Sequence, residues 1–320
     1  MIALGLGLLV TAVLAMISLL IGAADTNILS LLWGLPDDQA SQILMISRLP
    51  RTLALILAGS SLGIAGLVMQ MIVRNRFVEP STTGTTESAM LGFLVVTLLA
   101  PDWPIMGKML VAAGFALMGM FLFLRLLKFV PLRDVVLVPL VGIMLAGVIG
   151  AITSFFAYRF NLLPMLLGWS MGDFSGVLRG RYELLWIGLG CTIAAGIAAD
   201  RFTVAGMGRE FTTNLGLNYR RTMLFGLVIV SLIASVCLVS VGSIPFLGLV
   251  VPNVVSLILG DNMRRAVPWV AVGGAAFVLA GDILGRVVRY PYEVPISVVV
   301  GVIGSAFFIL LLLRRRTNAA

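Results

Sequence analysis

Residues 222–241 read TMLFGLVIVSLIASVCLVSV, a stretch without a charged side chain. Directly before it, residues 208–221 read GREFTTNLGLNYRR, the longest polar run in a chain that is otherwise mostly apolar. An apolar run of about 20 residues is long enough for a helix to cross the hydrocarbon core of a bilayer. The two stretches together predict a membrane-spanning helix that carries a structured polar segment at one end.

The polar segment has the signals of a short helix. Glu210 lies near its beginning, and Gly216 is placed to end the helix in a left-handed C-terminal cap. The arginine pair Arg220 and Arg221 follows. A solvated loop between two spans is the simpler interpretation. The regular signals favour a docking element, because a plain connector needs none of them.

The composition of the whole chain indicates a membrane protein. Hydrophobic residues make up 60% of it and charged residues only 11%, whereas about a quarter of a soluble domain is charged. In a bilayer each span must satisfy its own backbone groups, as a helix or as a closed barrel. The apolar runs are long and do not alternate with polar residues, so we predict an all-α polytopic protein with one transmembrane domain over residues 1–320.

Ten candidate spans can be counted, and charge sets their orientation. An even number places both termini on one side, and the basic tail Arg314 to Arg316 predicts that this side is the cytoplasm. With that orientation 14 of the 22 Lys and Arg residues lie inside and 8 outside. The spans are residues 2–22, 53–72, 88–100, 106–127, 135–157, 182–199, 222–241, 244–259, 267–285 and 294–313.

Two further stretches bear on packing. Residues 161–176 are too short and too rich in glycine to cross the bilayer, so we expect a partial helix at the outer face, packed on protein. Small residues are dense at 58–61 (AGSS) and 63–66 (GIAG). Because small residues let helices approach closely, a tightly packed bundle is expected.

Several kinds of chemistry are excluded. The chain has no histidine, which rules out HExxH metal sites and serine–histidine pairs, and no phosphate-binding loop, since Gly107-Lys108 lacks the upstream glycine. Cys191 and Cys237 sit in apolar runs and are expected to be core residues. We therefore expect no catalytic residue, no metal site and no cofactor on this chain. The net charge of +8 fits the membrane orientation, so no nucleic-acid partner is expected.

A chain that moves a solute uphill without these groups needs an energy source. Ion-coupled transporters usually place ionisable groups in mid-membrane. Here the acidic residues closest to apolar surroundings are Glu87 and Asp282. An ion-coupled secondary transporter is therefore the alternative to a transporter driven by a separate partner.

Four motifs resemble a known family, the permease subunits of type II ABC importers for iron–siderophore complexes, haem and vitamin B12, the FecCD family. They are RLPRTL at 48–53, NRFVEP at 75–80 with Gly84, GSIPFLGLVVP at 242–252, and EVPI at 293–296 with Gly301. Arg76, Pro245 and Asn253 depart from the residues most members have. The loop NRFVEPSTTGT is most similar to the branch for catecholate and mixed siderophores of the petrobactin, vibriobactin and anguibactin type.

The resemblance implies a fold like that of the vitamin B12 permease and a place in the bacterial inner membrane. It implies alternating access for ferric siderophores, with haem or vitamin B12 as alternative substrates. ATP and Mg would bind two cytoplasmic ATPase subunits. The other implied partners are a second permease, as a heterodimer or homodimer, and a periplasmic or lipid-anchored substrate-binding protein, in addition to membrane lipid.

The resemblance also assigns contact surfaces. Residues from about 207 to 221 would form the coupling helices that enter a groove on the ATPase, with these candidates: Gly208, Arg209, Glu210, Leu215, Gly216, Leu217, Arg220 and Arg221. At the outer face Arg48, Arg51 and Arg286 would dock acidic residues of the binding protein. The local alternative is that Asp282 and Arg286, spaced i,i+4, pair with each other.

The pathway would lie at the dimer interface, lined by the fifth and tenth spans. By position its candidate residues are Met144, Ser154, Phe155 and Ser305, and ordinary packing is the alternative. The cytoplasmic gate suggested by the resemblance consists of Gly84, Thr85, Thr86, Glu87 and Ser88, together with the loop around Pro131 to Arg133, which lies outside the residues that the structure describes.

Overall fold

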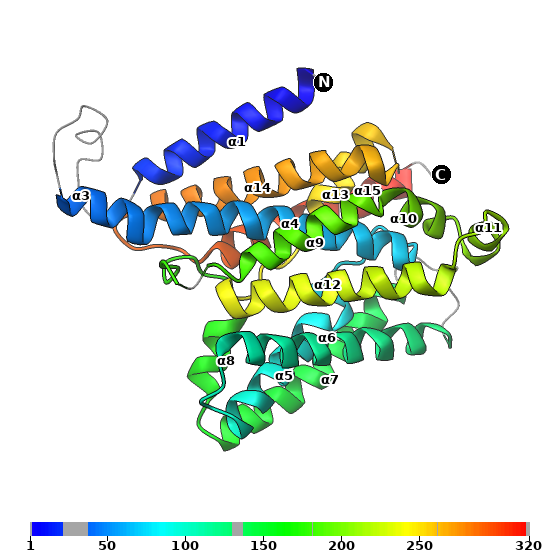
Figure 1. Cartoon of the computed structure of the whole chain (residues 1–320), viewed down its shortest axis with the longest axis horizontal. Helices are drawn as coiled ribbons and strands as arrows, with labels where there is room; N and C mark the ends of the chain where they lie inside the picture. Colours follow the sequence, from blue (N-terminus) through cyan, green and yellow to red (C-terminus); the bar gives the residue numbers. More distant parts are fainter. Residues whose placement is uncertain (1, 22–37, 130–136, 181, 261, 318–320) are drawn as a thin grey trace.

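The structure is a computed structural model that describes residues 2–21, 38–129, 137–180, 182–260 and 262–317 (Figure 1). These residues form helices and turns, and no strand is found among them. In chain order the elements are α1 (Ile2–Leu20), α3 (Asp38–Ile43), η1 (Leu44–Arg48), α4 (Leu49–Val73), η2 (Pro80–Thr83), α5 (Thr85–Leu99), α6 (Ile105–Leu127), α7 (Leu137–Arg159), α8 (Leu163–Ser170), α9 (Leu185–Ile197), α10 (Ala199–Gly206), α11 (Arg209–Asn214), α12 (Tyr219–Val241), α13 (Leu247–Leu259), α14 (Met263–Val287) and α15 (Ile296–Thr317).

Helix α4 is the central element. It packs against α14, α13, α12 and α9, and nearly all of its side chains are buried. Pro50 lies in its first turn, and the carbonyl group of Ile46, four residues earlier, accepts from the backbone N–H of Arg179 at 3.1 Å. The helix begins four residues before the predicted span, and η1 extends it further toward α3.

The expected close packing of small residues is confirmed along α4. A Cβ atom added at Gly59 would lie 2.5 Å from the carbonyl oxygen of Gly274 on α14, and one at Gly66 would lie 1.9 Å from that of Gly248 on α13. No larger side chain fits at either crossing. The backbones of α13 and α14 therefore lie directly against α4.

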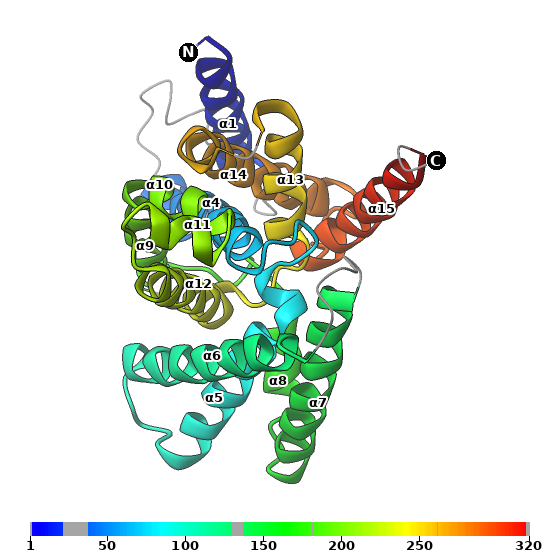
Figure 2. The same cartoon turned by 90° about the vertical axis from the view of Figure 1, so that its right-hand side faces the viewer.

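A second group of helices lies on the far side of α12 and contains α5, α6, α7 and α8 (Figures 1 and 2). Helix α15 packs on α13 and α14, and α1 lies at the edge of the molecule against α14. In Figure 2, α7 and α15 are both on the right-hand side. The short α8 is the partial helix expected between residues 161 and 176.

The length of the helices tests the predicted spans. In the described residues six helices are long and apolar enough to cross a membrane, or seven if the bent pair α9 and α10 is one span. Three shorter apolar helices, α5, α13 and the described part of α15, match the third, eighth and tenth predicted spans. The count of ten stays a prediction.

The sixth predicted span, residues 182–199, differs from the structure. The chain forms turns up to Leu184, α9 then ends at Ile197, and α10 leaves it at an angle of 65°. Helix α15 ends near the end of the molecule that carries α11, and α1 runs away from that end as the chain proceeds (Figure 1). This is the end predicted to be cytoplasmic.

Candidate functional site

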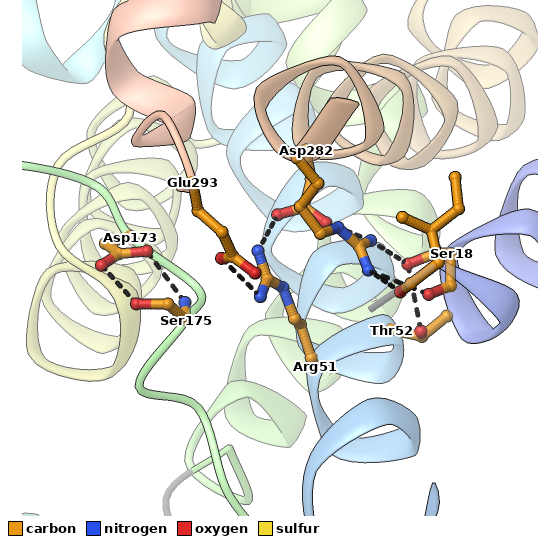
Figure 3. Close-up of polar contacts among 9 residues, drawn as sticks. Ser18, Arg51, Thr52, Asp173, Ser175, Asp282 and Glu293 are labelled. Atoms are coloured by element: carbon orange, nitrogen blue, oxygen red, sulfur yellow. Dashed lines mark hydrogen bonds and ion pairs between the residues drawn. The ribbon is translucent and has the colours of Figure 1, made fainter. Parts of the chain in front are cut away.

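Four charged residues form a cluster at the opposite, predicted outer end (Figure 3). Arg51 of α4 donates through Nη2 to Asp282 of α14 at 2.7 Å and through Nη1 to Glu293 at 2.8 Å. Arg286 donates to the second carboxylate oxygen of Asp282. Two cations thus share two anions, and charge-assisted hydrogen bonds of this kind are stronger than neutral ones.

At the same end of the molecule, two arginine side chains hold the C-terminal end of α1 in place. The last carbonyl groups of a helix have no partner within it, and cationic side chains can satisfy them. Arg48 and Arg286 do so here. Their acceptors are the carbonyl oxygens of Ser18, Leu19, Leu20 and Ile21, at 2.8–3.0 Å.

These bonds bear on the predicted docking of a binding protein. Arg48 and Arg286 are only 7% and 5% exposed, and 13% of the Arg51 side chain is exposed. The three guanidinium groups are thus used inside the chain. The local alternative, in which Asp282 pairs with Arg286, is confirmed, while the docking role stays a prediction.

At the inner end, the predicted short helix and its cap are confirmed. Helix α11 is followed by Gly216 with φ +77°, in the left-handed region. Leu217 N–H donates to Thr212 O at 3.1 Å, and Gly216 N–H donates to Thr213 O at 2.9 Å. These two bonds are the Schellman motif, which ends a helix at a glycine.

The predicted coupling residues lie on or beside this helix and differ in exposure. Arg209, Glu210, Leu215, Gly216, Arg220 and Arg221 are exposed, Leu217 is half-buried, and Gly208 is buried with φ +116°. Thr212 is fully buried and its hydroxyl group donates to carbonyl groups of Val204 and Gly208. This bond ties α11 to α10, so the exposed side chains stand on a fixed support.

Two of the sequence motifs meet inside the bundle. The carboxylate of Glu79, in the loop between α4 and α5, accepts from the backbone N–H of Phe246 at 2.8 Å. Two amide side chains add further bonds to the backbone of the same motifs. Asn253 of α13 donates to Arg76 O at 2.8 Å. Gln70 of α4 donates to the carbonyl oxygen of Gly248 at 3.2 Å. Non-helical backbone at this depth is tolerated because protein surrounds it.

The predicted gate residues surround the beginning of α5. Gly84 precedes the helix with φ +75° and Thr85 is fully buried. The Ser88 hydroxyl donates to the carbonyl group of Gly84 at 2.6 Å, and Thr86 is 8% exposed. In the described part of the chain, Oε2 of Glu87 is buried without a hydrogen-bond partner. The residues form one packed unit, and their gating role stays a prediction.

The predicted pathway residues lie on α7 and α15. Met144 and Phe155 are 65% and 63% exposed, Ser154 is exposed, and Ser305 is half-buried. The hydroxyl of Ser305 donates to Gly301 O at 2.6 Å. These positions are open to a neighbouring subunit or to a solute, and their role as a lining stays a prediction.

No group of three or more His, Cys, Asp or Glu side chains that could hold a metal ion occurs in the described ranges. Cys191 and Cys237 are buried and unpaired.

Similar proteins identify the family of this chain. The sequence profile of the FecCD transport family matches residues 9–314. The chain belongs to the FecCD transport family. A petrobactin import system permease of Bacillus subtilis is 46% identical to it over 96% of both chains. A ferric-anguibactin transport system permease of Vibrio anguillarum is 40% identical over 87% of this chain and 88% of its own.

One solved structure shares the fold of the FecCD chain. A metal-chelate type ABC transporter in an inward-facing conformation superposes with a TM-score of 0.76 and 24% identity, over 97% of this chain and 98% of the other. At this identity the similarity concerns the fold alone.

Two features of the FecCD chain were not predicted from its sequence. Phe211, four residues before Leu215 on the inner segment, is 49% exposed, and its i,i+4 spacing from an apolar residue was the available signal. The contact between Glu79 and Phe246 spans 167 positions. Only the presence of both residues in motifs pointed to it.

Proposed function

We propose that this chain is the membrane-spanning subunit of an ATP-driven importer that carries ferric siderophores across the bacterial inner membrane by alternating access. The observation that carries the proposal is its similarity, over nearly the whole length, to permeases for petrobactin and ferric anguibactin. Catecholate and mixed siderophores of that type are the proposed substrates.

The segment of residues 207–221, with α11, is the proposed contact with the ATPase subunits. Phe211 and Leu215 present apolar side chains, 49% and 57% exposed, on a helix end that the Schellman motif and Thr212 hold in place. Glu210, Arg220 and Arg221 would supply polar contacts around them. A short helix that inserts apolar anchors into a groove is a recurring mode of recognition.

At the outer end, docking of a substrate-binding protein is proposed to work through Arg51. Of the three predicted arginines, its guanidinium group pairs with the more exposed carboxylate, since 26% of the Glu293 side chain is exposed. An acidic residue of the partner would compete with Glu293 for Arg51. Arg48 and Arg286 would act indirectly, because they hold the neighbouring helix ends in place.

The pathway is proposed to run between α7 and α15 of this chain and the corresponding helices of a second permease. The exposed side chains of both helices are largely apolar, as Met144, Phe155 and Val302 illustrate. A weakly interacting surface suits a large anionic chelate, since strong sites would retain it. The residues Gly84 to Ser88 would close the inner end.

Reconstitution tests the proposal. Proteoliposomes with this chain, its second permease, ATPase and binding protein should take up radiolabelled ferric petrobactin only with internal ATP. Uptake of haem or vitamin B12 in preference to the siderophore would change the substrate. Uptake by the chain alone under an ion gradient would overturn the proposal and point to Glu87, because two arginines already engage Asp282.

A further inference from the structure

One carboxylate joins the loop between α4 and α5 to the loop between α12 and α13. Glu79 is 2% exposed, and no Lys or Arg of the described chain forms an ion pair with it. Its Oε1 accepts from Phe246 N–H at 2.8 Å and from the hydroxyl of Ser81. A Cβ atom added at Gly248 would lie 3.3 Å from the other carboxylate oxygen, so the carboxylate lies against the first turn of α13. A charge is buried at acceptable cost only where such donors replace water.

The Phe246 amide lies directly before α13, which starts inside the bundle. Leu247, its first residue, is fully buried, and Phe246 before it has φ +63°. The first N–H groups of a helix have no partner within it and favour a negative charge. Glu79 therefore caps α13 from a segment that lies far away in the sequence.

The helices α7 and α15 rest on the two sides of this contact. A Cβ atom added at Gly142 of α7 would lie 1.9 Å from the carbonyl oxygen of Thr82 in η2. One added at Gly304 of α15 would lie 2.4 Å from the Cβ of Phe246. The backbone of α7 thus lies directly on the turn that follows Glu79, and the backbone of α15 lies directly on Phe246.

In the described residues α7 and α15 have no extensive contact with each other. Their separation, seen on the right of Figure 2, depends on the loops on which they rest as well as on the packing of α7 against α5 and of α15 against α14. Within those loops, the hydrogen bond from Phe246 to Glu79 connects the support of one helix to the support of the other.

We infer that Glu79 is a positioning residue for transport, because its bond to Phe246 fixes the spacing of α7 and α15 as the inner end opens and closes. The inference rests on the proposed function and deepens it. Because it is only 2% exposed, Glu79 is assigned no contact with solute or nucleotide. It makes the two sides of the pathway move as one unit.

Glu79→Gln tests the inference in the reconstituted complex. Glutamine keeps the shape but places an NH₂ donor among backbone donors, so the link weakens. We expect assembly and ATP hydrolysis within about twofold of wild type and uptake lowered about tenfold, because nucleotide-driven movement no longer reaches both helices. Asp102→Asn, an exposed carboxylate in the turn before α6, is the matched control and should change none of these.

A distance measurement separates positioning from a general loss of activity. Spin labels at Leu140 of α7 and Ile309 of α15, both exposed, report the spacing of the two helices, since the native Cys191 and Cys237 are buried. Glu79→Gln should broaden the distance distribution in both nucleotide states. Chains that carry only one of the two labels serve as controls, because they report label-to-label distances between two copies of the chain in one complex. A wild-type distribution in Glu79→Gln would overturn the inference.

If Glu79→Gln fails to assemble, Glu79→Asp serves instead. It keeps the charge but shortens the reach, and it should broaden the same distribution and lower uptake. Wild-type spacing and uptake in Glu79→Asp would then refute the inference. A wild-type complex without siderophore uptake would instead refute the proposed function, and the distance comparison would still stand.

Discussion

Asp282 of α14 lies between two guanidinium groups, with Arg51 of α4 at 2.7 Å from one carboxylate oxygen and Arg286 bonded to the other. The side chain of Asp282 is only 3% exposed. Through Arg286 the same cluster reaches the last turn of α1. One buried carboxylate therefore connects three helices at the predicted outer end.

Asp282→Asn should strongly destabilise the chain. It leaves two buried cations with one acidic partner, and breaking a buried pair of this kind costs about 3–5 kcal/mol. Thermal unfolding in nanodiscs, followed by tryptophan fluorescence, measures the loss. Asp200→Asn is the control, because Asp200 and Arg264 pair with 66% and 76% of their side chains exposed, and such pairs contribute at most about 1 kcal/mol. Equal losses would contradict the assigned role.

Glu293→Gln should strengthen capture of the substrate-binding protein, because it frees Arg51 from one of its two acidic partners. Arg51→Gln should weaken capture. Both effects should shrink as salt rises, since exposed charges are screened. Binding measured by surface plasmon resonance at low and high ionic strength checks this. If neither variant changes the affinity at low salt, Arg51 does not dock the partner.

Leu215→Asp should abolish co-purification of the ATPase while the permease stays folded, because Leu215 is 57% exposed at the inner end. Phe211→Asp should act in the same way. Leu217→Asp is a weaker test of docking, because Leu217 is half-buried and its N–H closes the Schellman motif, so the substitution would also disturb the local fold. The control is Tyr292→Ser at the outer end, where the ring is 72% exposed. Normal complex formation in both variants would remove the docking interpretation of α11.

Gly216→Val should reduce ATPase binding, whereas Gly216→Asn should largely retain it. The residue has φ +77°, a conformation that costs an ordinary L-residue about 1–2 kcal/mol and that asparagine tolerates better. Pull-down of the ATPase at graded concentrations compares the two variants with wild type. Equal behaviour of valine and asparagine would show that the cap does not position the segment.

Local signals in the sequence predicted local structure well. Gly216, the small residues around Gly59, and the pairing of Asp282 with Arg286 were all visible because each depends on neighbours in the sequence or on residue size. The long apolar runs likewise identified helices, although the bend after Ile197 and the early start of α4 shifted several boundaries.

Long-range contacts could not be predicted in the same way. Arg286 bonds to the end of α1 across 265 to 268 positions, and Glu79 caps α13 across 167. Nothing in the spacing of these residues indicates a partner so far away. The docking arginines were therefore expected at the outer face, and of their internal bonds only the pairing of Arg286 with Asp282 was indicated by the sequence.

The 65° bend between α9 and α10 gives α11 an indirect connection to the membrane-spanning helices. Thr212 fastens α11 to α10, and α10 lies across the inner ends of α4, α12 and α14. With an ATPase docked on α11, as proposed, a displacement of α11 would reach α4, α12 and α14 through α10. Because α10 points 65° away from α9, such a displacement would have a component across the bundle as well as along it.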